Sequence, residues 1–243
     1  MKNSKVIAMW PGPRNISTAM MRSFGNRDDT AVSDEPLYAN FLVRTGINHP
    51  MRDEVIESMD SDWSSLIDFL SGTIPGEKEI WYQKHMTHHY PDGSSMDWID
   101  TFNNCFLIRN PARVINSYLK IYDIEHSDIL GFRQQKEIFD YISFKSNSTP
   151  LVIDSDDIVS DPQKFLSLIC KYLDIPFSSK MLSWPLGPRE YDGVWTKHWY
   201  KNVNKSDSFI SNINPMPLIS KKYLNIYQEC LEYYNYLYEY RVQ

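Results

Sequence analysis

The sequence predicts an α/β protein: a single domain with an open, mainly parallel β-sheet that helices cover on both faces. Short apolar runs of strand length alternate with stretches of helical spacing along the 243 residues, and this alternation is typical of parallel sheets. The apolar runs are continuous rather than broken by polar residues, as expected for strands buried on both faces. The length suits one such domain with an ample core.

Five segments are expected to form the strands. Their residues are apolar, β-branched or aromatic, and a turn or the start of a helix follows each one. In chain order they span residues 6–9, 30–33, 79–85, 105–108 and 151–154. Ligands of open parallel sheets bind at the carboxyl ends of the strands. The turns after the first four segments should therefore converge on one site.

Helices are expected between these strands, over residues 17–27, 37–44, 63–70, 112–122, 132–144, 162–173 and 218–240. Asn110 and Pro111 supply an N-cap and a first-turn proline to one of them. The polar stretch 48–61 is expected to be irregular. Residues 182–217 are rich in Pro, Gly, Trp and Asn, so they predict a long structured loop over the site, here called the late loop.

Composition and charge narrow the function classes. The chain is 42% hydrophobic and 14% aromatic, which excludes a disordered protein. Its formal net charge of -6 argues against general nucleic-acid binding, although local arginines can still bind a small anion. The mean hydropathy is -0.46, and no run approaches the roughly 18 apolar residues of a membrane span. We expect no nucleic-acid or membrane partner, no signal peptide and a cytoplasmic location.

The cysteines give the same picture of the compartment. Cys105, Cys170 and Cys230 are odd in number, lie far apart and have apolar neighbours. Buried free thiols in a reducing compartment explain this pattern best. No spacing typical of a zinc site is present, so we expect no metal.

The turn after the first strand has the features of an anion site. It consists of Gly12, Pro13, Arg14, Asn15, Ile16, Ser17 and Thr18. Free backbone N–H groups at the start of the following helix can point at a ligand, and Arg14 adds a planar cation. No lysine precedes the Ser17-Thr18 pair, so a magnesium–triphosphate ligand of the Walker type is disfavoured. The alternative is a capped helix with Arg14 on the surface.

A second strand end carries a matching pattern. Arg109 ends the fourth strand, and Ser117 lies eight residues later, about two helical turns on. Arg113 and Ser117 are four residues apart and share a helix face. Such an arrangement can bracket a phosphate monoester. The alternative is a solvated arginine before a helix with a neutral serine.

Together these blocks resemble the sulfotransferases that use 3′-phosphoadenosine-5′-phosphosulfate (PAPS), including small bacterial sulfotransferase-like proteins. In that family an arginine at a strand end and a serine eight residues later bind the 3′-phosphate, which implies this role for Arg109 and Ser117. A first turn of Pro-Arg-Ser-Gly-Thr-Thr type binds the 5′-phosphosulfate. Here Asn15 and Ile16 replace its Ser-Gly. The acidic segment 151–162 also matches, so the three blocks span most of the chain.

The resemblance implies a single sulfotransferase-like domain over residues 1–243, with a P-loop type of nucleotide-binding fold. The late loop would act as a clamp over the nucleotide, and the segment 218–240 would form a closing helix. The family's Gly-Asp-Trp-Lys-like core is similar to the stretch from Gly193 to Lys197. Trp195 would stack on adenine and Lys197 would meet phosphate charge. The alternative is a packed aromatic loop.

The expected activity is transfer of a sulfuryl group to a hydroxyl of a small molecule. Family branches place a catalytic glutamate where Glu35 stands, so Glu35 is the first candidate for the general base. The cytosolic branch has Lys-x-His with lysine on the sulfuryl group, which implies that role for Lys84 but puts Met86 where its histidine would be. His85 and His88 are the other candidates for the base, although strand alternation should turn His85 away from Lys84.

Two other function classes remain open: a phosphotransferase or nucleotide hydrolase of the same topology, and a non-catalytic nucleotide-binding protein. The oligomeric state is also open. Residues 37–75 and 120–145 are expected to wall a partly apolar acceptor pocket. Its candidate aromatic residues are Tyr38, Phe41, Trp63, Phe69, Tyr122 and Phe132.

Overall fold

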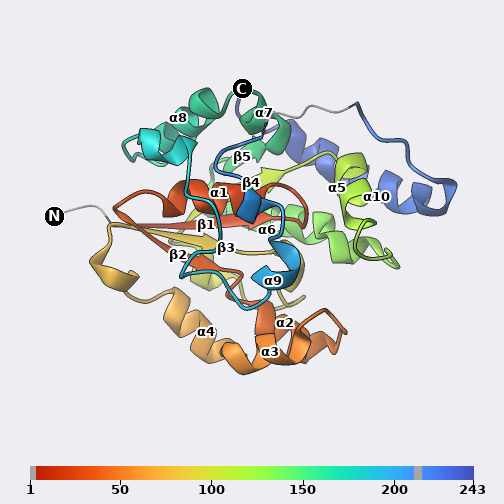
Figure 1. Ribbon diagram of the computed structural model, residues 1–243, viewed down its shortest axis with the longest axis horizontal. Helices are drawn as coiled ribbons and strands as arrows, with labels where there is room; N and C mark the ends of the chain where they lie inside the picture. The colour runs from red at the N-terminus through yellow and green to blue at the C-terminus, as the bar shows by residue number, and fades with distance from the viewer. Residues whose placement is uncertain (1–3, 211–214) are drawn as a thin grey trace.

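The computed structural model describes residues 4–210 and 215–243, and within them the chain forms one five-stranded sheet with the order β2-β3-β1-β4-β5 (Figure 1). The strands are β1 (Lys5–Pro11), β2 (Thr30–Asp34), β3 (Ile80–Lys84), β4 (Asn103–Ile108) and β5 (Leu151–Asp154). Each neighbouring pair is parallel. The predicted class and all five predicted strands are confirmed.

The register of the sheet aligns the ends of the strands that precede the candidate site residues. Lys84 at the end of β3 pairs with Met9 of β1 on one side and with Asp34 of β2 on the other. On the far side of β1, Pro11 pairs with Leu107 of β4. The turn after β1 therefore starts between Lys84 and the segment that follows β4.

Helices cover both faces of the sheet (Figure 1). Alternate residues of β1 face opposite cores: Ile7 and Met9 point to one, Ala8 and Trp10 to the other. The first core also receives α1 (Ser17–Gly25), α2 (Tyr38–Thr45), α3 (Arg52–Ser58) and α8 (Pro162–Tyr172). The second receives α4 (Trp63–Leu70), α5 (Pro111–Tyr118), α6 (Phe132–Ser146) and α10 (Leu224–Tyr238).

Outside the late loop, two short α-helices were not expected from the sequence. Helix α3 lies inside the stretch 48–61, where irregular structure was predicted. Val55 is the one fully buried residue of this stretch, and a single apolar residue among polar neighbours gives no helical pattern in the sequence. Helix α7 (Ser155–Ser160) begins directly after β5, where the Asp154 side chain accepts a hydrogen bond from the Asp156 N–H and caps it. The closing helix α10 is shorter than predicted, because residues 221–223 form a separate 3₁₀ turn before it.

The late loop contains one short helix, α9 (Thr196–Trp199), and residues 211–214 of this loop lie outside the described residues. The three cysteines are free and buried, as predicted. Within the described parts of the chain, no helix has the length and apolar character needed to cross a membrane.

Candidate functional site

A cavity of about 310 Å³ opens at the carboxyl edge of the sheet. The turns after β1 and β2, the end of β3 and the segment after β4 all contribute to its wall. The sequence-predicted residues that line it are Pro13, Arg14, Asn15, Ile16, Ser17, Thr18, Glu35, Lys84, His88, Arg109 and Ser117. Gly12, His85, Trp195 and Lys197 are not part of its lining.

The turn after β1 has an unusual backbone conformation. Arg14 and Ile16 both adopt left-handed conformations, with φ of 61° and 62°. Left-handed residues within a turn produce a concave array of N–H groups that binds anions. For a β-branched residue such as Ile16 this conformation is strained. It stands at the position where the family pattern has glycine.

The same turn is fixed to the sheet by polar side chains. The Asn15 amide donates to the Leu107 carbonyl of β4 at 2.6 Å, and the Ser155 hydroxyl donates to the Asn15 carbonyl at 2.9 Å. Gly12 has a packing role, because a Cβ at this position would lie only 2.8 Å from the Leu130 carbonyl oxygen. These contacts hold the turn against β4 and the start of α7, so the turn lines the cavity from a rigid base.

The two predicted anion-binding blocks meet in the cavity. Arg14 donates through Nε to the Ser117 hydroxyl at 3.0 Å, and Arg109 donates through Nη1 to the Arg14 carbonyl at 2.5 Å. Burial lowers the pKa of both guanidinium groups from its ordinary value. Arg113 turns aside and forms an ion pair with Asp156 at 2.8 Å. We call the turn from Gly12 to Thr18, together with Arg109 and Ser117, the cradle.

Lys84 is the centre of a buried polar cluster beside the cradle. Its Nζ contacts Tyr200 Oη at 2.5 Å, Glu35 Oε1 at 2.7 Å, Asp34 Oδ1 at 3.0 Å and Thr18 Oγ1 at 3.3 Å. Burial opposes its charge, but Asp34 and Glu35 outweigh that effect, so the pKa of Lys84 is raised. Lys84 therefore stays a cation at the edge of the cavity.

Glu35 occupies a strained turn directly after β2, with φ of 47°. Burial raises the pKa of its carboxyl group, Lys84 lowers it in part, and the neighbouring Asp34 raises it again. A carboxylate with a raised pKa that lines a cavity is a suitable proton acceptor.

The two candidate histidines lie in different environments. His85 is fully buried behind the sheet, where its ring stacks on Trp10 with centroids 4.6 Å apart and its Nε2 lies 2.9 Å from Gln83 Oε1. Strand alternation causes this separation from Lys84, as expected. His88 lines the cavity, and burial lowers the pKa of its imidazole to about 3. It is therefore uncharged at neutral pH.

The late loop contributes Tyr200 to the site, a residue that the sequence analysis did not identify. The hydroxyl of this buried tyrosine contacts Lys84 and donates to Asp34, with oxygen separations of 2.7 and 2.8 Å. Trp195 is buried behind Tyr200 and donates to its oxygen through Nε1 at 3.4 Å. Trp195 thus supports Tyr200. Sequence reasoning missed Tyr200 because neither charge nor spacing distinguishes this tyrosine from the others, and only the folded loop brings it to Lys84.

Lys197 is exposed and is not part of the cavity lining, whereas two other lysines line a cleft to which Arg14 of the cradle also contributes. Lys120 after α5 and Lys201 after α9 line a second cleft, of about 360 Å³, together with Arg14 and Trp199. This cleft adjoins the main cavity, because Arg14 and Trp199 line both. Lys201, four residues after the predicted Lys197, therefore brings a positive charge of the late loop to the cleft beside Arg14.

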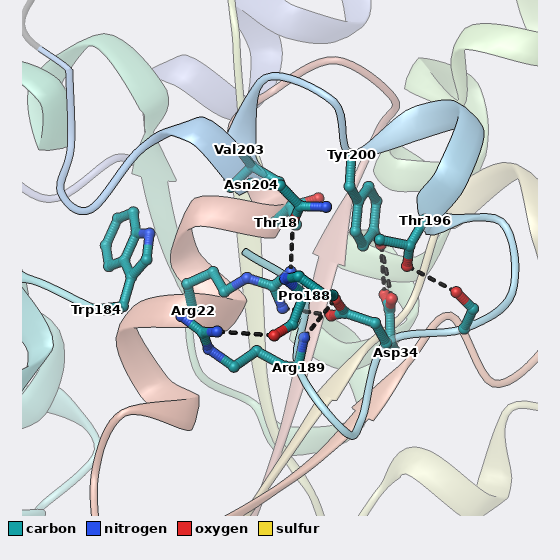
Figure 2. A network of polar contacts seen from close by, with 12 residues as sticks. Thr18, Arg22, Asp34, Trp184, Pro188, Arg189, Thr196, Tyr200, Val203 and Asn204 are labelled. Carbon is teal, nitrogen blue, oxygen red and sulfur yellow. Dashed lines mark hydrogen bonds and ion pairs between the residues drawn. The ribbon is translucent and has the colours of Figure 1, made fainter. Parts of the chain in front are cut away.

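Helix α1 anchors the late loop (Figure 2). Arg22 and Asp192 form a buried, two-pronged ion pair in which Nη2 lies 2.7 Å from Oδ2. The same Nη2 donates to Asn204 Oδ1 at 3.2 Å. Figure 2 shows this contact and the Tyr200–Asp34 contact on neighbouring parts of the loop. One helix therefore supports both the cradle, at its start, and the loop, further along.

The aromatic residues predicted to wall an acceptor pocket are divided by the fold. Tyr38 lines the cavity, and Phe41 packs directly behind it. Tyr122 contacts the cavity residue Trp199, with ring centroids 6.1 Å apart. Trp63, Phe69 and Phe132 pack elsewhere and do not line the cavity. No cluster of three or more His, Cys, Asp or Glu side chains suited to a metal ion occurs among the described residues.

Two curated plant proteins are similar to this chain. A branched-chain-amino-acid aminotransferase-like protein 2 of Arabidopsis thaliana is 34% identical over 96% of the chain, and the like-named protein 1 is 37% identical over 87%. The matched regions are 41% and 38% of those proteins. The chain therefore spans about two fifths of their length.

Solved sulfotransferase domains share the fold. The domain from the curacin biosynthetic pathway aligns over 100% of both chains, with a TM-score of 0.51 and 15% identity. The domain from the Synechococcus PCC 7002 olefin synthase aligns over 94% of this chain and 95% of that chain, with a TM-score of 0.54 and 16% identity.

The sequence match is direct evidence of family. A family model described as a sulfotransferase domain matches residues 4–239, which include the cradle, Lys84, Glu35 and the described late loop. The resemblance inferred from the motifs is confirmed, and the chain belongs to the sulfotransferase domain family.

Proposed function

We propose that this protein transfers a sulfuryl group from PAPS to a hydroxyl group of a small-molecule acceptor. The observation that carries the proposal is the meeting of the cradle with Lys84 and Glu35 in one cavity. Sulfuryl transfer, like phosphoryl transfer, depends mainly on positioning and charge stabilisation. The cavity offers cations for the donor and a carboxylate for the acceptor.

The two halves of the cradle would bind the two ends of the donor. Arg109 and Ser117 would hold the 3′-phosphate, while the N–H groups between Pro13 and Thr18 would face the 5′-phosphosulfate. The Arg14–Ser117 hydrogen bond at 3.0 Å would open to admit phosphate oxygens, which are stronger acceptors than a hydroxyl. Lys197 and Trp195 would reach the nucleotide only after movement of the late loop, whereas Lys120 and Lys201 already face the adjoining cleft.

Lys84 and Glu35 have separate roles in this proposal. Lys84 would stabilise the negative charge of the transferring group and the leaving phosphate. Glu35 would accept the proton of the acceptor hydroxyl, because its carboxyl lines the cavity 2.7 Å from Lys84 Nζ. His88 is the alternative proton acceptor.

The cytoplasmic location expected from the sequence stays a prediction.

Replacing Arg109 by alanine tests the donor site. We expect the affinity for 3′-phosphoadenosine-5′-phosphate to fall by about 30- to 150-fold, as for the loss of one or two charge-assisted hydrogen bonds worth about 2–3 kcal/mol. Isothermal titration calorimetry measures this directly. Arg133→Ala is the matched control, since Arg133 pairs with surface acids outside the cavity. Tight binding of magnesium–ATP and none of the desulfo-nucleotide would instead favour a phosphotransferase.

Glu35→Gln tests the chemical step. We expect nucleotide affinity within about twofold of the unmodified protein and turnover at least about 100-fold lower, the usual cost of losing a general base. Turnover is measured with labelled PAPS and a metabolite extract, by release of the desulfo-nucleotide and mass gains that match sulfation. Glu137→Gln, at a surface ion pair, is the control. Full activity in Glu35→Gln would transfer the role of base to His88.

A further inference from the structure

Lys84 is shared between three parts of the chain that meet at the edge of the cavity. Its Nζ contacts Asp34 and Glu35 at the end of β2, and Thr18 at the start of α1. The fourth contact is the hydroxyl oxygen of Tyr200 in the late loop. A lysine ammonium has three N–H donors. Four acceptors therefore already surround this cation, and it can meet a ligand only by giving one of them up.

Asp34 is the partner of Lys84 for which the late loop supplies a substitute. Its Oδ1 lies 3.0 Å from Lys84 Nζ and 2.8 Å from the Tyr200 oxygen, and its Oδ2 lies 2.7 Å from that oxygen. Figure 2 shows the Tyr200 side chain directed at this carboxylate. A buried carboxylate that loses its cation is costly unless another donor remains. The Tyr200 hydroxyl is such a donor, so Asp34 keeps a hydrogen bond when Lys84 turns away.

The proton of Tyr200 is available for this role. Burial raises the pKa of its phenol well above the ordinary value, and the carboxylates of Asp34 and Glu35 raise it further. The hydroxyl therefore stays protonated and donates to Asp34, while its oxygen accepts from Lys84 at 2.5 Å and from Trp195 Nε1 at 3.4 Å. One hydroxyl thus joins the cation to its counter-ion.

The late loop and α1 hold Tyr200 in place. Its N–H donates to the Thr196 carbonyl at 3.0 Å, and its own carbonyl accepts from the Asn204 N–H at 2.9 Å. The guanidinium carbon of Arg22 lies 5.9 Å from the centroid of its ring. Tyr200 is only 4% exposed. It therefore offers a fixed donor, whereas a lysine has a flexible four-carbon stem and can turn.

We propose that Tyr200 is a positioning residue for sulfuryl transfer: it holds the Asp34 carboxylate so that Lys84 can turn to the transferring group. This inference rests on the proposed sulfotransfer from PAPS. In that reaction the bond between sulfur and the phosphate oxygen of PAPS breaks, and a bond between sulfur and the acceptor oxygen forms. The electron pair of the broken bond stays on the phosphate oxygen, where Lys84 meets the developing charge. The proton of the acceptor hydroxyl passes to Glu35.

The late loop thereby controls the chemical step. With the loop seated, Asp34 has two donors and Lys84 is free to leave. Without the Tyr200 hydroxyl, Asp34 would depend on Lys84, and the two would stay paired in a buried site where opposite charges attract strongly. Nucleotide binding would not change, because the contacts of this hydroxyl are with the Lys84 cluster and Trp195 rather than with the two arginines of the cradle.

Tyr200→Phe removes the hydroxyl and keeps the ring. We expect turnover at saturating PAPS to fall by about 10- to 30-fold, which is less than the loss of a whole transition-state donor, because Lys84 is still present. The affinity for the desulfo-nucleotide should stay within about twofold of the unmodified protein, since the cradle is intact. Turnover is measured by release of the desulfo-nucleotide from labelled PAPS in a metabolite extract, and affinity by calorimetry.

Tyr234→Phe is the matched control. It removes a hydroxyl that donates to a buried carboxylate, that of Asp154, at 2.7 Å but outside the cavity lining. Both variants should shift the urea midpoint by a similar amount, and only Tyr200→Phe should lose turnover. Equal turnover in the two variants contradicts the inference. An unmodified protein that neither binds the desulfo-nucleotide nor consumes PAPS instead defeats the proposed function, and the inference with it, so the two failures are distinguishable.

Asp34→Asn tests whether Tyr200 acts through Asp34. An uncharged amide does not hold Lys84 as a counter-ion, so the Tyr200 hydroxyl has no charge left to compensate. In the Asp34→Asn background, Tyr200→Phe should therefore lower turnover by less than about threefold, because the effects of two residues that act through one contact are not additive. A purely structural effect on the loop would give the same loss in both backgrounds and would overturn the proposal.

Discussion

The cradle and the late loop line the same cavity, but different kinds of contact hold them in place. The cradle follows strand ends, and its shape is a backbone property, with Arg14 and Ile16 left-handed and Asn15 hydrogen-bonded to β4. The late loop has little regular structure of its own and is held by side chains, above all by Arg22 and Asp192. The first region is positioned by the sheet, the second by a few individual contacts.

The difference shows how the site is assembled. The cradle brings Arg14 and Arg109 together wherever the sheet forms, because their distance is set by strand pairing. Tyr200 reaches Lys84 only if the whole loop is seated on α1. The loop is thus the part of the site whose geometry depends on distant side chains, and a single substitution far from the cavity should disturb it selectively.

Breaking the loop's anchor should have the largest effect. Arg22→Ala leaves the buried carboxylate of Asp192 without its cation, and we expect the free energy of unfolding to fall by about 3–5 kcal/mol. Urea denaturation followed by circular dichroism measures it. Lys180→Ala removes a surface ion pair with Asp28 and should cost at most about 1 kcal/mol. Equal losses in the two variants would contradict the distinction drawn here.

The cradle could be predicted from the sequence because its residues sit beside the strands in the chain. Arg14, Arg109 and Ser117 stand at fixed offsets from apolar runs, so locating the strands located them as well. Tyr200 could not be predicted, since its contact with Lys84 spans 116 positions of sequence and depends on how the loop packs. Lys197 was selected by a local pattern, and the fold exposes it while Lys201 faces a cleft.

Asp154 is a second buried acid, and it shows how burial affects a carboxyl group whose hydrogen-bond partners are neutral. Asp154, at the end of β5, accepts hydrogen bonds from two neutral groups, the Tyr234 hydroxyl at 2.7 Å and the Asp156 N–H at 2.7 Å. Burial raises its pKa to about 6, whereas an unfolded aspartate titrates near about 3.9. Between these values the folded state binds more protons, so this group's contribution to stability falls as the pH rises, by about 3 kcal/mol above pH 6.

Asp154→Asn should remove that pH dependence. Its amide oxygen can still accept from the Asp156 N–H, and its amide N–H can donate to the Tyr234 hydroxyl, which reverses that second hydrogen bond. We expect the variant to gain about 2–3 kcal/mol relative to the unmodified protein between about pH 4 and pH 6.5, as measured by urea denaturation across this range. Asp161→Asn is the matched control, because this exposed aspartate caps α8 in the same way. A parallel pH profile for Asp154→Asn and the unmodified protein would show that Asp154 titrates normally in the folded state.

The smallest effect concerns the strained residue of the cradle. Ile16 has φ of 62° and packs partly against the first core. Glycine there would remove a left-handed penalty of about 1–2 kcal/mol. It would also lose apolar burial worth about 1 kcal/mol and gain unfolded-state entropy worth about 0.5–1 kcal/mol. The net change in the free energy of unfolding for Ile16→Gly should therefore lie within about 1 kcal/mol of zero.

Ile16→Ala supplies the contrast that makes this small effect decisive. Alanine loses the same packing but keeps the left-handed strain, so Ile16→Gly should be the more stable variant by about 0.5–1 kcal/mol. This order is the reverse of that found within helices and strands, where alanine is preferred. If alanine proved equal or better in urea denaturation, the turn would not be left-handed at Ile16. The N–H array that the cradle offers to an anion would then have to be formed in another way, so this small difference tests the geometry on which the donor site depends.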